Sequence, residues 1–221
     1  WLDEIKHDAQ ILFLMGDLFD FWHEWKYVVP KGYVRILGKL AELKDSGIDI
    51  YFFVGNHDLW MKDYLEEEIG IPVFFEKQYY EISGKNFLLA HGDGLGPGDK
   101  GYKRMKKLFT NPIAQWFFKW LHPDIAMKIA VYFSTKNKMI SGVEDMKFLG
   151  EDKEFLILYS KEKLKSEKID YFVYGHRHLP MILDLKIDEN AAKYVNLGDW
   201  ISYFTYGVFD GAEFKIEEYK Q

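Results

Sequence analysis

Cysteine is absent from this chain of 221 residues. A chain without thiols has no disulfide framework and no zinc site built on thiolates, and this absence is typical of a reducing compartment. Long apolar runs are also lacking, since none approaches the ~20 consecutive residues that a membrane-spanning helix needs. The sequence therefore predicts a cytoplasmic protein without a transmembrane helix.

Acidic residues are nearly absent from one segment. Residues 100–138 hold nine of the 29 Lys and Arg residues but only one acid, Asp124, although the whole chain has a net charge of −6. The same segment contains the aromatic run QWFFKWL at residues 115–121. Apolar helices with basic flanks suit the surface of an anionic membrane or a lipid phosphate. A dimer interface, or ordinary core beneath a charged face, is the alternative interpretation.

Hydrophobic residues make up 48% of the chain, which is enough for the core of one large domain. Strand and helix patterns alternate in the first half of the chain, and the second half is rich in strands. The predicted helices cover residues 30–47, 59–69, 99–137 and 151–168, and the third is interrupted near residues 111–112 and 122–123. The predicted strands cover residues 11–15, 48–54, 73–75, 79–82, 86–90, 170–174, 181–187, 193–197, 203–209 and 213–218. This order favours an α/β fold of two sheets with helices outside them.

Four of the apolar runs end in the same kind of loop, in which Gly or His stands beside carboxylate, amide or imidazole groups. These loops are GDLFD at residues 16–20, GNHD at 55–58, HGD at 91–93 and GHRH at 175–178. Ligands of open α/β sheets collect beyond the carboxyl ends of the strands, where such loops converge. Repeated use of one construction predicts that the four loops build a single functional site.

The polar side chains of these loops form a set suited to metal ions. The candidate ligands are Asp17, Asn56, His91, His176 and His178. Oxygen and imidazole donors suit Mn, Fe or Zn in a hydrolytic site. Two such ions roughly 3.5–4 Å apart clamp a phosphate and activate a water, and a carboxylate is the natural bridge between them. We therefore predict two divalent metal ions, most simply Mn, with Asp17 at the centre.

The four motifs, in this order, resemble the calcineurin-like metallophosphoesterase superfamily. The resemblance implies that Asp17 bridges the two metals, that Asn56, His91 and His176 complete one site, and that His178 belongs to the other. It also implies that His57 lies beside the scissile phosphate and is oriented by Asp58.

The remaining polar residues near these motifs receive weaker interpretations. We expect Asp20 and Asp93 to shape loops rather than to bind metal. His7, His23 and His122 have no comparable context, and we expect them to be inert.

The sequence departs from the superfamily at its start. The family's Asp-x-His motif follows the first strand, and nothing before Asp17 matches it. The missing strand would lie in the middle of a sheet, where its absence leaves neighbouring backbone groups unpaired. We therefore expect ~20–30 further residues before Trp1, enough for a strand and a crossover helix.

A narrower set of residues is similar to the UDP-2,3-diacylglucosamine pyrophosphatase family of lipid A biosynthesis. These residues are 17–22 (DLFDFW), 91–93, Asp99 with Tyr102, Asn111-Pro112 and 197–200 (LGDW). That family releases UMP and a lipid sugar 1-phosphate, and its helical insertion houses the acyl chains. The resemblance implies one domain over residues 1–221 with a helical cap insertion at about 99–140, peripheral on the inner membrane. By the same analogy, the residues that contact substrate are Asp99, Tyr102, Ser134 and Lys138.

His57 keeps the choice of substrate open, because members of that pyrophosphatase family commonly carry Arg at this position. A sugar phosphate leaves without a proton, so a cation that neutralises charge is sufficient there. An alkoxide leaving group needs an acid such as His. A phosphodiesterase or phosphatase with another substrate is therefore one alternative, and a binding module that has lost catalysis is another.

Overall fold

A computed structural model describes residues 1–97, 100–145 and 147–220, with only the backbone described at residues 135–145. The chain divides into two compact units. Unit 1 comprises Trp1–Glu76 and Gly101–Asn137, and unit 2 comprises Lys77–Lys100 and Lys138–Gln221.

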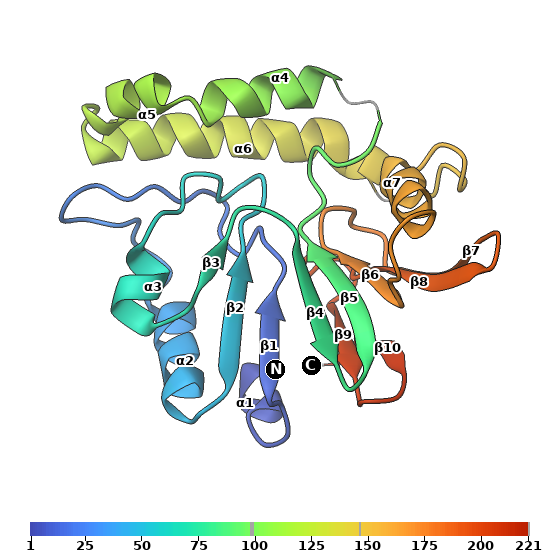
Figure 1. Ribbon diagram of the computed structural model, residues 1–221. Helices are drawn as coiled ribbons and strands as arrows, with labels where there is room; N and C mark the ends of the chain where they lie inside the picture. Colours follow the sequence, from blue (N-terminus) through green and yellow to red (C-terminus); the bar gives the residue numbers. More distant parts are fainter. Residues whose placement is uncertain (98–99, 146, 221) are drawn as a thin grey trace. The chain divides into compact units, whose positions relative to one another are not determined.

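Unit 1 is built on a parallel sheet of order β1-β2-β3 (Figure 1). The strands are β1 (Ile11–Leu14), β2 (Asp49–Phe53) and β3 (Val73–Phe74). Leu14 lies opposite Phe52, so β1 and β2 end at nearly the same level. Because the strands are parallel, the loops that follow β1 and β2 leave the same edge of the sheet.

Three short helices accompany this sheet: α1 (Leu2–Ile5), α2 (Val34–Asp45) and α3 (Tyr64–Ile69). Leu40 and Leu43 of α2 are fully buried in one cluster with Ile50 and Phe52 of β2. Burying a Leu or Phe side chain contributes ~1.5–3 kcal/mol, so this cluster fixes the sheet beneath the loops.

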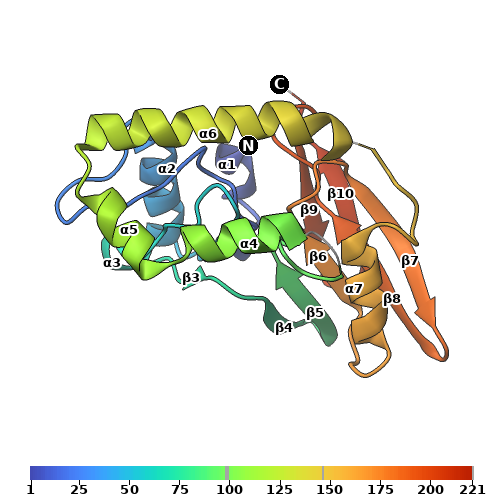
Figure 2. The ribbon, with the colours of Figure 1, turned by 90° about the horizontal axis from the view of Figure 1, so that it is seen from above.

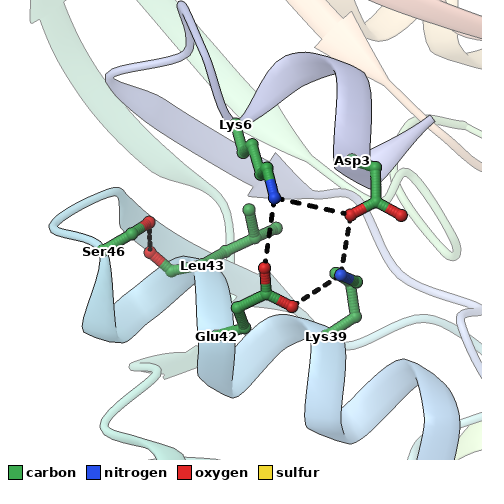
Figure 3. Close-up of polar contacts among 6 residues, drawn as sticks. All are labelled: Asp3, Lys6, Lys39, Glu42, Leu43 and Ser46. Atoms are coloured by element: carbon green, nitrogen blue, oxygen red, sulfur yellow. Dashed lines mark hydrogen bonds and ion pairs between the residues drawn. The ribbon is translucent and has the colours of Figure 1, made fainter.

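An ion-pair network joins α1 to α2 on the surface (Figure 3). Lys39 contacts Asp3 at 2.7 Å and Glu42 at 2.5 Å, and Lys6 contacts Glu42 at 3.4 Å. These carboxylates are exposed, so each pair contributes at most ~1 kcal/mol. The network sets the position of α1 more than it stabilises unit 1.

The helix α3 begins later than its apolar pattern predicts. Residues 59–63 are not helical because the chain wraps onto the buried carboxylate of Glu24, which accepts hydrogen bonds from the backbone N–H groups of Lys62, Asp63 and Tyr64. The indole of Trp22 also donates to Glu24, at 2.8 Å. Glu24 thus satisfies backbone donors that would otherwise be unpaired at the start of α3.

The long helical segment is broken where the sequence predicts. Its parts are α4 (Lys100–Phe109), α5 (Pro112–Lys119) and α6 (Pro123–Asp145). Asn111 caps α5 by accepting hydrogen bonds from Ile113 and Ala114, with Pro112 in the first helical position. Within unit 1, α4 and α5 run in one direction along the chain, and α6 runs back in the opposite direction (Figure 2).

Unit 2 contains a five-stranded sheet of order β4-β5-β6-β8-β7. Its strands are β4 (Gln78–Ile82), β5 (Lys85–Ala90), β6 (Tyr171–Tyr174), β7 (Met181–Ile187) and β8 (Asn190–Asn196). The pairs β5–β6 and β6–β8 are parallel, and Ala90 lies opposite Tyr174. His91 and the loop at 175–178 therefore leave the same edge of this sheet.

The rest of unit 2 consists of a helix packed on that sheet and a separate pair of strands. The helix α7 (Phe155–Leu164) packs buried Leu156 and Ile157 into the same cluster as Leu88 and Phe172. The strands β9 (Thr205–Phe209) and β10 (Phe214–Glu218) form a separate antiparallel pair.

The structure confirms the mixed α/β class with more than one sheet and with flanking helices. A helix with the length and apolarity to cross a bilayer does not occur in the described part of the chain.

Candidate active site

Asp17 is the first candidate site residue along the chain. It follows Gly16 directly after β1 and has a backbone φ of 57°, in the left-handed region. A residue other than glycine pays on the order of 1–2 kcal/mol for that conformation, although Asp tolerates it better than most. Such strain persists where the surroundings require one orientation. The Asp17 carboxylate accepts a hydrogen bond of 2.8 Å from the backbone N–H of His57.

Gly55 lets the second loop approach Asp17 closely. A Cβ atom added to Gly55 would collide with the Asp17 carboxylate and lie 2.7 Å from the Asp17 backbone nitrogen. Only glycine fits without moving one of the two loops. The GDLFD and GNHD loops are therefore in direct contact, as the parallel strands beneath them predict.

Asp58 ties the same two loops together through their backbones. Its side chain is fully buried, and its two oxygens accept hydrogen bonds from Gly55 (2.5 Å) and Leu18 (3.2 Å). Bonds between an ionised acceptor and backbone N–H groups are about twice as strong as neutral ones. Asp58 thus fixes the turn that carries half-buried Asn56 and His57.

The ring of His57 contacts a residue of α6. Its Nδ1 lies 3.0 Å from the Ser134 Oγ and 3.3 Å from the Asp20 carbonyl oxygen, while Ser134 donates to that carbonyl at 2.9 Å. Because the Ser134 hydroxyl hydrogen points to Asp20, the consistent arrangement has His57 Nδ1–H as a donor. Nε2 is then the nitrogen available to substrate. His57 and Ser134, which were both assigned to the site by resemblance, are therefore in contact.

In unit 2, the imidazoles of His91 and His176 face each other. His91 Nε2 lies 3.2 Å from His176 Nδ1, and the backbone N–H groups of Gly175 and His176 both donate to the His91 carbonyl at 2.9 Å. Two nitrogens bound side by side to one ion, each at ~2.1 Å, stand about 3.0–3.4 Å apart. The observed separation fits that requirement, and the oxygen donors of the other loops are of the type that divalent ions accept.

His178 is held by a carboxylate. Its Nδ1 lies 3.0 Å from Asp199, whose other oxygen accepts hydrogen bonds from the backbone N–H groups of Ile201, Ser202 and Tyr203. Burial alone would raise the pKa of Asp199, but these backbone donors, with His178, lower it overall. Asp199 is therefore an anion that orients His178 and leaves Nε2 for a ligand.

Arg177, between the two histidines, points into the interior. It forms a buried ion pair with Glu154 at 3.0 Å and donates to the Lys147 carbonyl at 2.7 Å. The amide of buried Asn196 donates to the Arg177 carbonyl at 2.6 Å. The loop that carries His176 and His178 is thus fixed by partners on both sides.

The predicted site residues fall in both units. Unit 1 holds Asp17, Asn56, His57, Asp58 and Ser134, and unit 2 holds His91, His176 and His178. Tyr102 is half-buried in α4, Asp99 lies outside the described residues, and the side chain of Lys138 in α6 lies outside them too. Within the described side chains of either unit, no three His, Asp or Glu residues gather around one point.

Sequence reasoning assigned no role to Asp199, Glu154 or Asn196. Asp199 had a usable signal, because Gly198-Asp199 follows an apolar strand as Gly16-Asp17 does. Glu154 and Asn196 had none, since each reaches its partner across about 20 residues of sequence.

Known proteins resemble this chain over most of its length. A UDP-2,3-diacylglucosamine hydrolase from Porphyromonas gingivalis (strain ATCC BAA-308 / W83) is 41% identical over 98% of this chain and 86% of its own length. A protein of the same name from Edwardsiella ictaluri (strain 93-146) is 27% identical over 90% of this chain and 76% of its own. Zinc-bound Vps29 from Entamoeba histolytica matches with 11% identity and a TM-score of 0.32 over 93% of this chain and 88% of its own, too low to carry an argument.

The family model described as calcineurin-like phosphoesterase matches residues 1–180, which include all four polar loops. A match of this extent confirms the resemblance carried by the motifs. The chain belongs to the calcineurin-like phosphoesterase family, whose enzymes use divalent metal ions.

Proposed function

We propose that this protein hydrolyses the pyrophosphate bond of UDP-2,3-diacylglucosamine, giving UMP and 2,3-diacylglucosamine 1-phosphate. The observation that carries the proposal is the 41% identity, over 98% of the chain, to a protein named for hydrolysis of that compound. The contacts of the polar loops support it, because each predicted ligand loop is held by specific partners rather than left as loose surface.

We assign two divalent metal ions to Asp17, Asn56, His91, His176 and His178, with Mn as the first choice and Fe or Zn as alternatives. Such ions supply Lewis acidity toward phosphoryl oxygens and make a bound water acidic. The chain's own contribution is orientation: the His57 backbone N–H and the left-handed conformation of Asp17 fix the Asp17 carboxylate, and Asp199 fixes His178.

His57 acts on the charge of the reacting phosphate. Water adds to the uridylyl phosphorus and loses a proton to solvent, the bond from that phosphorus to the bridging oxygen breaks, and the sugar phosphate departs as an anion. In the arrangement described above, Ser134 and Asp20 hold Nδ1–H, which leaves Nε2 to face the phosphoryl oxygens as a proton donor when the ring is protonated.

We place the substrate's acyl chains under a cap formed by residues of about 99–140 within one domain of residues 1–221, with contacts from Asp99, Tyr102, Ser134 and Lys138. The basic and aromatic character of that segment supports a location on the cytoplasmic face of the inner membrane.

The decisive experiment compares UDP-2,3-diacylglucosamine with a generic aryl phosphodiester in the presence of Mn. We expect release of UMP at a kcat/KM far above that for the aryl ester, and loss of turnover in Asp17→Ala and His91→Ala. Equal kcat/KM for the two substrates would favour a general phosphodiesterase, and full turnover in Asp17→Ala would end the metal assignment. A binding module would show no turnover and at most one bound metal per chain.

His57 gives a second test, because it is also the observation that favours a different phosphoester. For pyrophosphate cleavage the leaving group needs no proton, so His57→Arg should keep kcat within about tenfold. A substrate with an alkoxide leaving group requires the acid, and the same variant would then lose ~10²–10⁴-fold in kcat. That larger loss would move the assignment to a phosphodiesterase or phosphatase.

A further inference from the structure

A surface pocket of unit 1 is separate from the residues assigned to catalysis. It has a volume of about 340 Å³ and is lined by Trp25, Lys26, Tyr27, Val28, Lys119 and Trp120. We call it the aromatic–lysine pocket. None of its six residues belongs to the four polar loops or is among the assigned substrate contacts, although Lys119 and Trp120 lie within the proposed cap segment.

Large apolar side chains stand unusually exposed around this pocket. Tyr27 is 84% exposed and Trp120 is 73% exposed, and Val28 is 48% exposed. The neighbouring helix α5 adds exposed Trp116 and Phe117. A contiguous apolar surface of this kind marks an interaction site rather than ordinary protein surface.

The exposed side chains rest on a fixed base. The Trp25 backbone N–H donates to the Val28 carbonyl at 3.1 Å, which closes the loop and leaves Lys26 and Tyr27 at its tip. The ring of Trp25 packs 4.5 Å from that of buried His23, which also contacts Trp60 at 5.3 Å. Packed aromatic rings therefore lie behind the Trp25 side of the pocket.

The charge of the pocket indicates which kind of ligand it can bind. Its two charged residues, Lys26 and Lys119, are both basic, and Lys26 also lies 4.9 Å from the centre of the Tyr27 ring. The helices that continue from it share this sign, since Asp124 is the only acid in residues 100–138. Tyr and Trp prefer the boundary between the acyl and headgroup layers of a bilayer, where their rings are amphipathic. Apolar rings with basic neighbours thus complement an anionic lipid.

We propose that the aromatic–lysine pocket binds an anionic phospholipid of the membrane surface, separately from the substrate. Lys26 and Lys119 pair with the lipid phosphate, and the rings of Tyr27 and Trp120 pack on its glycerol and upper acyl chain. The inference rests on the proposed membrane location, and it identifies the residues that hold the protein there.

The test measures binding of the purified full chain to vesicles of phosphatidylcholine with and without phosphatidylglycerol, by co-sedimentation. Near an anionic surface each Lys contributes ~1 kcal/mol, or about fivefold in affinity. We expect the double variant Lys26→Gln/Lys119→Gln to bind anionic vesicles about 25-fold more weakly. A double variant that is matched in charge, Lys153→Gln/Lys186→Gln, changes exposed lysines of unit 2 and should lose much less affinity.

The aromatic side chains are tested in the same assay. Tyr27→Ser/Trp120→Ser should weaken binding about tenfold or more, whereas Phe75→Ser, which removes another ring that is 53% exposed, should leave binding unchanged. Unchanged thermal melting excludes misfolding in each variant. Unaltered vesicle binding by both pocket variants, or loss equal to that of the controls, would overturn the inference.

Hydrolysis of detergent-dispersed substrate separates this inference from the proposed function. We expect kcat and KM to be unchanged in Lys26→Gln and Tyr27→Ser, whose residues line the pocket but lie outside the proposed cap of about 99–140. A raised KM with unchanged vesicle binding would mean that the pocket holds the substrate's own acyl chain, and would also overturn the inference. Vesicle binding that follows the predicted pattern in a chain without hydrolase activity would instead refute the proposed function alone.

Discussion

The two units hold their polar loops by different means. In unit 1, the carboxylates of Asp17 and Asp58 accept hydrogen bonds from backbone N–H groups of the loops themselves. In unit 2, the histidines are held by side chains that stand behind them, among them Asp199 and the Glu154–Arg177 ion pair. In unit 1, therefore, residues that are proposed to act in catalysis also hold the loops in place. In unit 2, the residues that hold the loops are different from the histidines that are proposed to bind metal.

Buried ionisable groups differ in the same way. His23 in unit 1 is 1% exposed, and neither ring nitrogen has a hydrogen-bond partner among the described residues. Glu154 in unit 2 is equally buried but is paired and hydrogen-bonded. Burial without a partner disfavours the charged form of His23, whereas the Glu154 carboxylate is buried against the opposite charge of Arg177 and a backbone N–H donor.

The largest effect is expected where structure and chemistry coincide. Asp17→Asn keeps an oxygen that accepts the His57 N–H but removes the charge that two metal ions would share. Loss of several kcal/mol of charge stabilisation predicts a fall of at least about 1000-fold in kcat, with little change in thermal stability. Steady-state kinetics and thermal melting measure both quantities, with Asp63→Asn as an exposed control. A 1000-fold loss that comes with unfolding would show that Asp17 acts as a structural residue.

The next largest effect is expected for the ion pair that supports the histidine loop of unit 2. Glu154→Leu removes the carboxylate that pairs with buried Arg177, which should lower the free energy of unfolding by ~3–5 kcal/mol. The double variant Glu154→Leu/Arg177→Met removes both charges and should recover most of that loss. Urea unfolding of the single and double variants measures it. A loss below ~1 kcal/mol in the single variant would show that the pair does not hold the loop.

In unit 1, the buried residue His23 should make the free energy of unfolding depend on pH. Burial, with the charges of Lys62 and Lys119, lowers the pKa of His23 to about 4 from 6.5. Between these values the unfolded chain binds the proton and the folded chain does not, so stability falls as the pH drops from about 6.5 to 4. The total is on the order of 3 kcal/mol.

His23→Phe removes that titration while keeping the ring contacts with Trp25 and Trp60. The difference in unfolding free energy between wild type and variant should therefore change with pH across this window and level off below it. Urea unfolding at several pH values tests the expectation. A difference that is constant from pH 7 to pH 4 would show that His23 titrates normally.

The smallest effect is expected for Asp199, which contacts the candidate ligand His178 and should influence its affinity for metal. Asp199→Asn should keep the contact with His178 but remove the anion that orients it. The loss of such a partner costs ~10–100-fold in metal affinity. Titration of Mn into the metal-free protein by calorimetry reads this directly, and KM for substrate should not move. Unchanged metal affinity would remove Asp199 from the site.

Local sequence patterns predicted much of the architecture. The breaks in the long helical segment at residues 111–112 and 122–123 are present because Pro and an Asn cap act within a few residues. The contact between Asp17 and Gly55 follows from two parallel strands that end together. The late start of α3 was missed, because Glu24 reaches its backbone from about 40 residues away.

The fold class, the family and the order of the polar loops were predictable without the structure, since each depends on short motifs and on periodicity. Tertiary structure alone decided which groups hold those loops: Ser134 on His57, Asp199 on His178 and Glu154 on Arg177. These contacts join residues between 21 and 77 positions apart. No local pattern encodes such a pair, because its energy arises only when folding removes both partners from water.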